Sequence, residues 1–129
     1  MTKQWNEGSP SSNQSVNPET RSVLLGSRIA GRLADAEALG WSALIMRGGA
    51  TAEHQVLEPL PFGAVSASLR LAHVLHWMER YNEAEALFLA ALTSAEAEVN
   101  KNEASNVALT LVAFAQQHMG KMYLGLPPV

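Results

Sequence analysis

The chain has 129 residues, a length that suits one domain with a single core. Hydrophobic residues make up 47% of it and aromatic residues only 6%, which is typical of packed helices and not of a β-sandwich. The formal charge is −3 and the sequence has no Lys/Arg cluster, so nucleic acid is not an expected partner. The absence of Cys excludes disulfides, thiol nucleophiles and Cys-ligated zinc.

The first segment, residues 1–16, is polar and lacks helical periodicity, so we expect a flexible N-terminal arm. It has no apolar stretch of the kind that a secretory signal carries. Apolar runs elsewhere fall short of the roughly 20 residues that a membrane-spanning helix requires. We therefore expect a soluble, cytoplasmic protein with no membrane partner.

A helix start follows the arm at residues 17–19, Asn-Pro-Glu, which supply a cap, a proline at the first helical position and an acid near the positive helix end. Apolar residues then recur at helical spacing over residues 23–46. Gly31 lies in the middle and is expected to divide this segment into two helices. Residues 18–47 are thus predicted to form a helical hairpin.

Residues 48–63 contain several glycines and prolines and little periodicity, which predicts a connector. A helical pattern resumes at Ala64. Asn82 and Glu85 have the spacing of a capping box, which predicts the start of a further helix after a turn at residues 79–81. The second hairpin is therefore expected over residues 64–98.

The last part of the chain has the pattern of a single helix over residues 106–120, which follows a polar stretch at residues 100–105. Two prolines then prevent the helix from continuing, so residues 127–129 are predicted to be a short tail. The predicted helical domain spans residues 17–126.

Two parts of the chain resemble each other. Residues 32–39 align with residues 80–87, and an Ala-Leu pair follows each, at residues 43–44 and 91–92. Self-similarity of this kind is typical of stacked helix pairs, in which Ala at fixed spacing lets the two helices approach closely. The sequence therefore predicts an all-α protein made of antiparallel helix hairpins.

The second unit resembles a tetratricopeptide repeat. Leu71 and Ala72 occupy the positions of the family's Leu and small residue. The further matches are Tyr81, Ala84, Phe88 and Ala91. The unit departs from the motif at Ser68, where the family has Trp, at Glu79, where it has the turn Gly, and in lacking the closing Pro.

The other units carry the resemblance more weakly. The first matches at Leu24, Gly31, Leu33, Ala36 and Ala43, with Gly40 in place of a large aromatic residue. The last segment matches at Leu109, Val112, Ala113 and Gly120, with the long spacing of kinesin light chain repeats. The resemblance implies about two and a half tetratricopeptide-like repeats in a short right-handed superhelix.

The family binds a peptide or a helix of a partner protein on the concave face formed by the first helix of each repeat, so the resemblance implies an adaptor or co-chaperone role and no enzymatic activity. The positions that it assigns to the concave face are Arg21, Leu25, Arg28, Leu69, His73, His76, Trp77, Thr110, Phe114, Gln117 and His118. It places on the convex side the acids Asp35, Glu37, Glu83, Glu85, Glu96 and Glu98.

A face with Arg, His and aromatic side chains suits a partner segment with an acidic or carboxylate group beside an apolar anchor. The alternative for Trp77 and Phe114 is that they pack between helices, which is the commoner fate of a single aromatic residue at helical spacing. The clamp of Lys and Asn residues that some members use for a C-terminal carboxylate is not reproduced here.

Three histidines, His73, His76 and His118, have a spacing that also allows a three-nitrogen metal site, but no carboxylate lies at ligand spacing on either helix. We expect no metal and no cofactor. A nucleophile paired with a base, a carboxylate pair and a phosphate-binding glycine loop are all missing from the sequence, so we expect no catalysis.

The incomplete last repeat leaves an apolar helix side without a following helix. A structural protein that uses its repeats for homodimerisation is therefore the main alternative, and a small-molecule or metal-binding regulator is a further one. The dimer surface would consist of Met119, Met122, Tyr123, Leu124 and Leu126. The alternative for Met122, Tyr123, Leu124 and Leu126 is that they fold back as a cap over the uncovered helix side.

Overall fold

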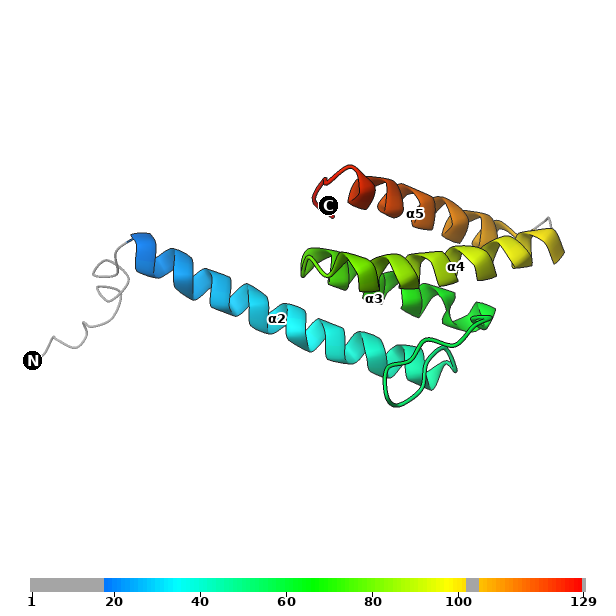
Figure 1. The fold of residues 1–129 in the computed structure, drawn as a ribbon, viewed down its shortest axis with the longest axis horizontal. Helices are drawn as coiled ribbons and strands as arrows, with labels where there is room; N and C mark the ends of the chain where they lie inside the picture. The colour runs from blue at the N-terminus through cyan, green and yellow to red at the C-terminus, as the bar shows by residue number, and fades with distance from the viewer. Residues whose placement is uncertain (1–17, 102–104, 129) are drawn as a thin grey trace, which may run out of the picture. The chain divides into compact units, whose positions relative to one another are not determined.

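The computed structural model describes residues 18–101 and 105–128, with side chains from residue 28 onward (Figure 1). Its elements are α2 (Pro18–Met46), the 3-10 helix η1 (Phe62–Ala64), α3 (Val65–Trp77), α4 (Tyr81–Lys101) and α5 (Asn106–Tyr123). These residues contain no strand and only an isolated antiparallel bridge between Ala50 and Val56. The described chain is therefore all-α, as predicted. The arm predicted over residues 1–16 lies outside the described residues.

The chain divides into two compact units, residues 1–32 and residues 33–129, and the boundary falls inside α2. α2 is continuous through Gly31, so the predicted hairpin over residues 18–47 is wrong. A glycine in a helix interior costs only about 1 kcal/mol relative to Ala. Without a proline or a helix-ending turn beside it, this cost is too small to end a helix of good helix formers.

α3 and α4 pack along each other and are joined by a turn at residues 78–80, one residue earlier than predicted. α4 begins at Tyr81, so Asn82 lies inside its first turn and does not cap it. Arg80 stands just before the helix and donates to both carboxylate oxygens of Glu83, each at 2.7 Å. This paired acid in the first turn takes the place of the predicted capping box.

Three helices end in the same backbone motif, in which a residue with positive φ follows the helix and two N–H groups bond back to its last turn. Gly48 (φ 77°) ends α2 and Gly125 (φ 72°) ends α5. Glu79 (φ 62°) ends α3, where its N–H donates to His76 and the next N–H donates to Leu75. A non-glycine residue therefore occupies the left-handed position of the α3–α4 turn.

Glu79→Gly is expected to raise the free energy of unfolding by about 1 kcal/mol. A residue with a Cβ is destabilised by about 1 to 2 kcal/mol in the left-handed conformation, and Gly removes this strain. The greater freedom of Gly in the unfolded chain offsets part of the stabilisation. Urea denaturation measures this difference. Glu79→Ala is the matched control, since it removes the carboxylate and keeps the Cβ. Equal stabilisation by both variants would contradict a backbone origin.

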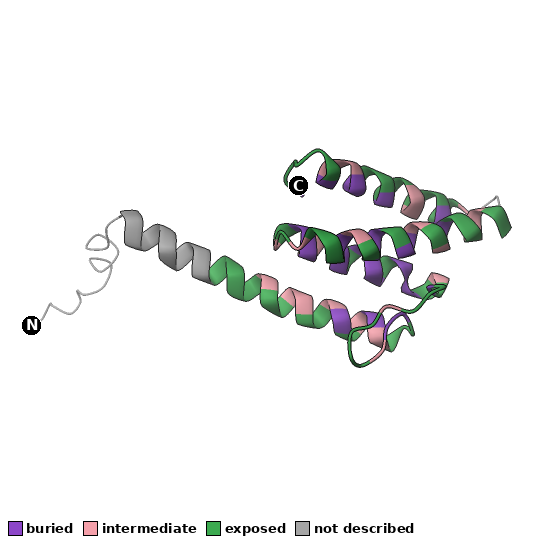
Figure 2. Cartoon of the chain, viewed as in Figure 1, coloured by how far each residue is buried: buried purple, intermediate pink, exposed green. Residues whose placement is uncertain are grey.

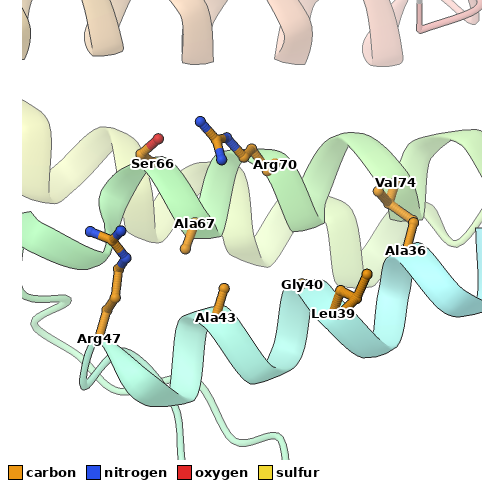
Figure 3. Close-up of a pocket in the computed structure, with 9 residues that line it drawn as sticks. All are labelled: Ala36, Leu39, Gly40, Ala43, Arg47, Ser66, Ala67, Arg70 and Val74. Carbon is orange, nitrogen blue, oxygen red and sulfur yellow. The ribbon is translucent and has the colours of Figure 1, made fainter.

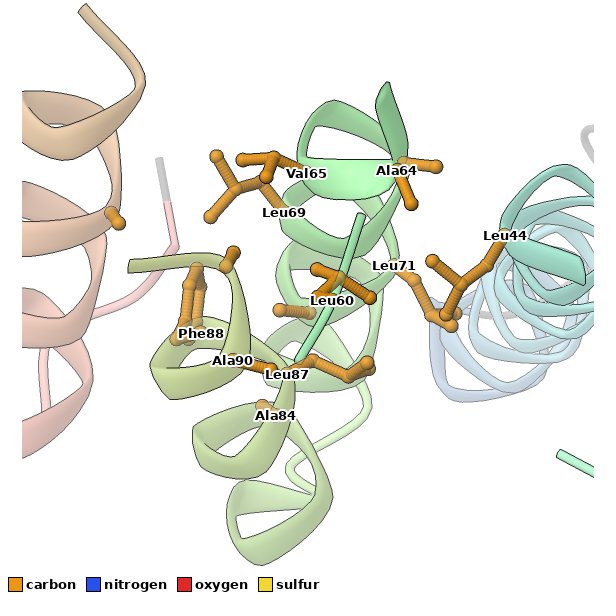
Figure 4. Close-up of a cluster of buried hydrophobic side chains, with 14 of the residues drawn as sticks. Leu44, Leu60, Ala64, Val65, Leu69, Leu71, Ala84, Leu87, Phe88 and Ala90 are labelled. Atoms are coloured by element: carbon orange, nitrogen blue, oxygen red, sulfur yellow. The ribbon is translucent and has the colours of Figure 1, made fainter. Parts of the chain in front are cut away.

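α4 supplies the centre of the core, with α3 on one side and α5 on another (Figure 2). Phe88 and Leu87 of α4 are buried in one hydrophobic cluster with leucines of α3, among them Leu69 (Figure 4). Ser68 lies in the same interface, where its hydroxyl donates to the carbonyl of Leu87 at 2.9 Å. A small, hydrogen-bonded side chain therefore fills the position at which the tetratricopeptide motif has Trp.

The connector between α2 and η1 contributes to the core through Leu60 and Ala50, which are buried. Its His54 ring stacks on Trp41 of α2, with centroids 4.4 Å apart and planes 6° apart. Trp41 in turn donates its indole N–H to Glu37 at 3.2 Å, and Glu37 pairs with Arg80 at 2.7 Å. The predicted loop is thus held to α2 by a stacked ring and by apolar packing.

None of the described helices combines the length and the apolar character that crossing a membrane requires.

Candidate functional site

Four of the predicted concave-face residues come together where α3 meets α5. The rings of His73 (α3) and His118 (α5) lie edge to face, with centroids 4.9 Å apart. Trp77 donates its indole N–H to Nε2 of His73 at 3.3 Å, and the ring centroids of Phe114 and His118 are 4.1 Å apart. Trp77 and Phe114 remain 43% and 37% exposed. We call these four residues the aromatic–histidine surface.

The other predicted positions lie elsewhere. Leu69 and His76 are buried in the helix interface, so their assignment to an open face is wrong. His118 is buried as well, with its ring against those of His73 and Phe114, so Trp77 and Phe114 supply the exposed part of the aromatic–histidine surface. Amphipathic spacing alone could not separate them from the exposed side of α3, because that helix is packed over much of its circumference. Thr110 is exposed and donates its hydroxyl to the carbonyl of Asn106 at 2.8 Å.

Gln117 is exposed on α5, on the helix that carries Phe114 and His118. Arg28 is exposed in the first unit, and the side chains of Arg21 and Leu25 lie outside the described residues.

The predicted dimer surface divides into a buried and an exposed part. Met119 and Met122 are buried in the core, so they cannot form an open surface. Leu124 and Leu126 are exposed. Tyr123 is exposed as well, but its hydroxyl donates to Glu85 of α4 at 2.6 Å, which raises the pKa of Tyr123.

Residues 125–128 lie beside Trp77. A hollow of about 270 Å³ is lined by His76, Trp77 and Tyr81 on one side and by residues 125–128 on the other, and Pro128 is buried. The predicted tail therefore borders the aromatic–histidine surface.

Burial is the first cause that lowers the pKa of both His73 and His118, since it disfavours the charged imidazolium. Repulsion adds to it, from His76 and Lys121 at His73 and from His73, Lys121 and His76 at His118. Within the described residues, the buried Nδ1 atoms of these three histidines have no hydrogen-bond partner. The surface therefore holds neutral imidazoles at neutral pH.

The free energy of unfolding is expected to fall as the pH drops below 6.5. Because the folded-state pKa of His73 and His118 lies below the usual histidine value of 6.5, the unfolded chain takes up protons at a higher pH than the folded chain does. The stabilisation that the two neutral rings contribute is fully present above pH 6.5. It is lost as the pH falls through their folded-state pKa values. Urea denaturation at about pH 7.5 and about pH 5.5 measures the difference.

The double variant His73→Gln, His118→Gln isolates this effect, because Gln keeps a polar group at each position and does not titrate. The variant is expected to lose much of the decrease between the two pH values. An unchanged decrease would assign the acid sensitivity to other groups.

The histidines do not form a metal site in this arrangement. Among residues 28–101 and 105–128, no group of three or more His, Asp or Glu side chains is placed to hold a metal ion.

A second feature, a groove of about 400 Å³, runs between α2 and α3 (Figure 3). Small residues form its floor, and Ala43 and Ala67 point toward each other across it. Its lining consists of Ala36, Leu39, Gly40, Ala43, Arg47, Ser66, Ala67, Arg70 and Val74. We call it the α2–α3 groove. The repeat resemblance assigned none of these residues to a binding site, although it matched Ala36 and Ala43 as motif positions.

Comparison with known proteins shows no matching family model, no matching curated protein and no matching solved structure.

Proposed function

We propose that this chain is a protein-binding module of the tetratricopeptide-like helical-repeat kind, and that it binds a peptide or helix of a partner protein on the aromatic–histidine surface. The observation that carries the proposal is the exposure of Trp77 and Phe114, on two helices, beside the paired rings of His73 and His118. Large aromatic side chains that are partly exposed and held in place by their neighbours are typical anchors for a partner's apolar side chain.

The order of helices supports the same role. α3 and α5 are the helices that the repeat resemblance assigns to the concave face, and both contribute to the aromatic–histidine surface. The hydrogen bond from Trp77 to His73 fixes the indole in one orientation, which lowers the entropy lost when a partner binds. An oriented aromatic anchor on these two helices favours an adaptor role without catalysis.

The proposal is tested with peptides selected from a random phage-displayed library against the intact chain. Trp77→Ala and Phe114→Ala are each expected to weaken binding of the selected peptides by about tenfold or more, as anchor residues do. Leu89→Ala is the matched control, because Leu89 is 44% exposed and lies on α4, outside the surface. Peptides that bind both anchor variants as tightly as the intact chain would contradict the proposal.

Homodimerisation remains the second candidate, favoured by the exposure of Leu124 and Leu126 at the end of α5. Light scattering over a wide concentration range, on the intact chain and on a chain ending at Gly120, separates the two roles. A stable dimer that is lost on truncation would favour assembly. A concentration-independent monomer would exclude it.

A further inference from the structure

The α2–α3 groove is lined by two arginines, Arg47 and Arg70. Within the described part of the chain, neither Arg47 nor Arg70 forms an ion pair, whereas Arg80 pairs with Glu37 and Glu83. Arg47 donates to the carbonyl of Gly63 at 3.4 Å, a long bond at an exposed site. The chain as a whole carries a charge of −3, so this is a local cationic site on an acidic protein.

The groove has two chemically different ends (Figure 3). Arg47 and Ser66 lie at one end, and Arg70, one helical turn along α3 from Ser66, extends its guanidinium toward that end. Leu39 and Val74 lie at the other, and Leu39 is 71% exposed. A ligand that satisfies both ends must carry a negative group and a large aliphatic group at a fixed separation.

That separation follows from helix geometry. Leu39 lies on α2 and Arg47, eight positions later, directly follows its last residue and still donates its N–H to the carbonyl of Ala43. Ser66 and Val74 are eight residues apart on α3. With a rise of 1.5 Å per residue, each pair spans about 12 Å along its helix. The same distance separates residues about seven or eight positions apart on one face of a partner helix.

The floor favours a helix over an extended peptide. Helical backbone satisfies its own N–H and C=O groups, whereas an extended segment laid on Ala36, Gly40 and Ala43 would leave its backbone groups without partners. Small floor residues also let a docked helix approach closely, as in other helix-in-groove complexes.

We propose that the α2–α3 groove binds an amphipathic helix of a partner protein that carries Asp or Glu at Arg47 and Arg70 and, about two turns away on the same face, Leu, Ile or Met at Leu39 and Val74. The groove shares no residue with the aromatic–histidine surface. This second binding site therefore does not depend on the function proposed above.

A synthetic helix tests the proposal directly. The probe is a fluorescein-labelled peptide of Ala and Gln with one Glu and one Leu seven positions apart on the same face, and its binding to the intact chain is followed by fluorescence anisotropy at low salt. Replacing the Glu with Gln, or the Leu with Ala, is expected to weaken binding by about tenfold. Added NaCl should weaken the Glu peptide more than the Gln peptide.

Variants of the chain locate the contact. Arg70→Glu and Arg47→Glu are each expected to weaken binding of the Glu peptide by about tenfold, and a peptide with Lys in place of Glu should bind these variants better than it binds the intact chain. Arg32→Glu is the matched control, since it makes the same charge change at an exposed position of α2 outside the groove. Circular dichroism verifies that each variant is folded.

Trp77→Ala should leave binding of the Glu peptide unchanged, which separates this site from the aromatic–histidine surface. Equal binding of the Glu and Gln peptides, equal binding by Arg70→Glu and the intact chain, or no binding of the Glu peptide at all would each overturn the proposal.

Discussion

Phe88→Ala is expected to lower the free energy of unfolding by about 3 to 5 kcal/mol, the range for removing a large aromatic side chain from a packed core. The Phe88 ring is fully buried in α4, the helix that packs against both α3 and α5. Its removal leaves a cavity between three helices whose backbones are already close, so little relaxation can fill it. Urea denaturation followed by circular dichroism at 222 nm measures the loss.

The neighbouring position provides the control for Phe88→Ala. Leu89 is 44% exposed on the same helix, so Leu89→Ala should cost less than about 1 kcal/mol. Similar losses for the two variants would show that α4 is not the centre of the core.

Gly49→Ala is expected to lower the free energy of unfolding by about 1 to 3 kcal/mol, through overpacking. A Cβ at Gly49 would lie 2.6 Å from Cδ1 of Leu44 and 2.8 Å from Cβ of Ala64. The leucine tip can rotate away, but the Ala64 Cβ is attached directly to backbone and cannot. Thermal and urea denaturation both report the effect.

Gly63→Ala is the control for Gly49→Ala, because a Cβ at Gly63 meets nothing within 4 Å and its φ is not positive. Its expected effect lies between zero and a stabilisation of about 1 kcal/mol. A loss at Gly63 as large as that at Gly49 would contradict the overpacking argument.

The helices themselves were largely predictable, because their signals are local. Proline at position 18 marks the start of α2, and the apolar spacing from Val65 onward marks α3. Gly31 was misread because a glycine signals a break only when the surrounding backbone must turn there. The turn after α3 was found although Glu79 replaces the expected glycine, since the chain accepts a left-handed conformation at that residue.

The sites were less predictable, since they depend on which helices become neighbours. Spacing on α3 put Leu69, His73 and Trp77 on one face, but packing against α4 and α5 buries Leu69 and leaves Trp77 exposed. The α2–α3 groove escaped prediction for the same reason: Arg47 and Arg70 are isolated in the sequence and meet only when α2 and α3 pack. The periodicity of a sequence does not predict which distant segments come into contact.

α3, α4 and α5 each pack chiefly against the helix that precedes or follows them in the chain. Contacts of this kind close only short loops, and chains that rely on them cross a low entropic barrier when they fold. The packing order thus predicts rapid folding of this part of the molecule.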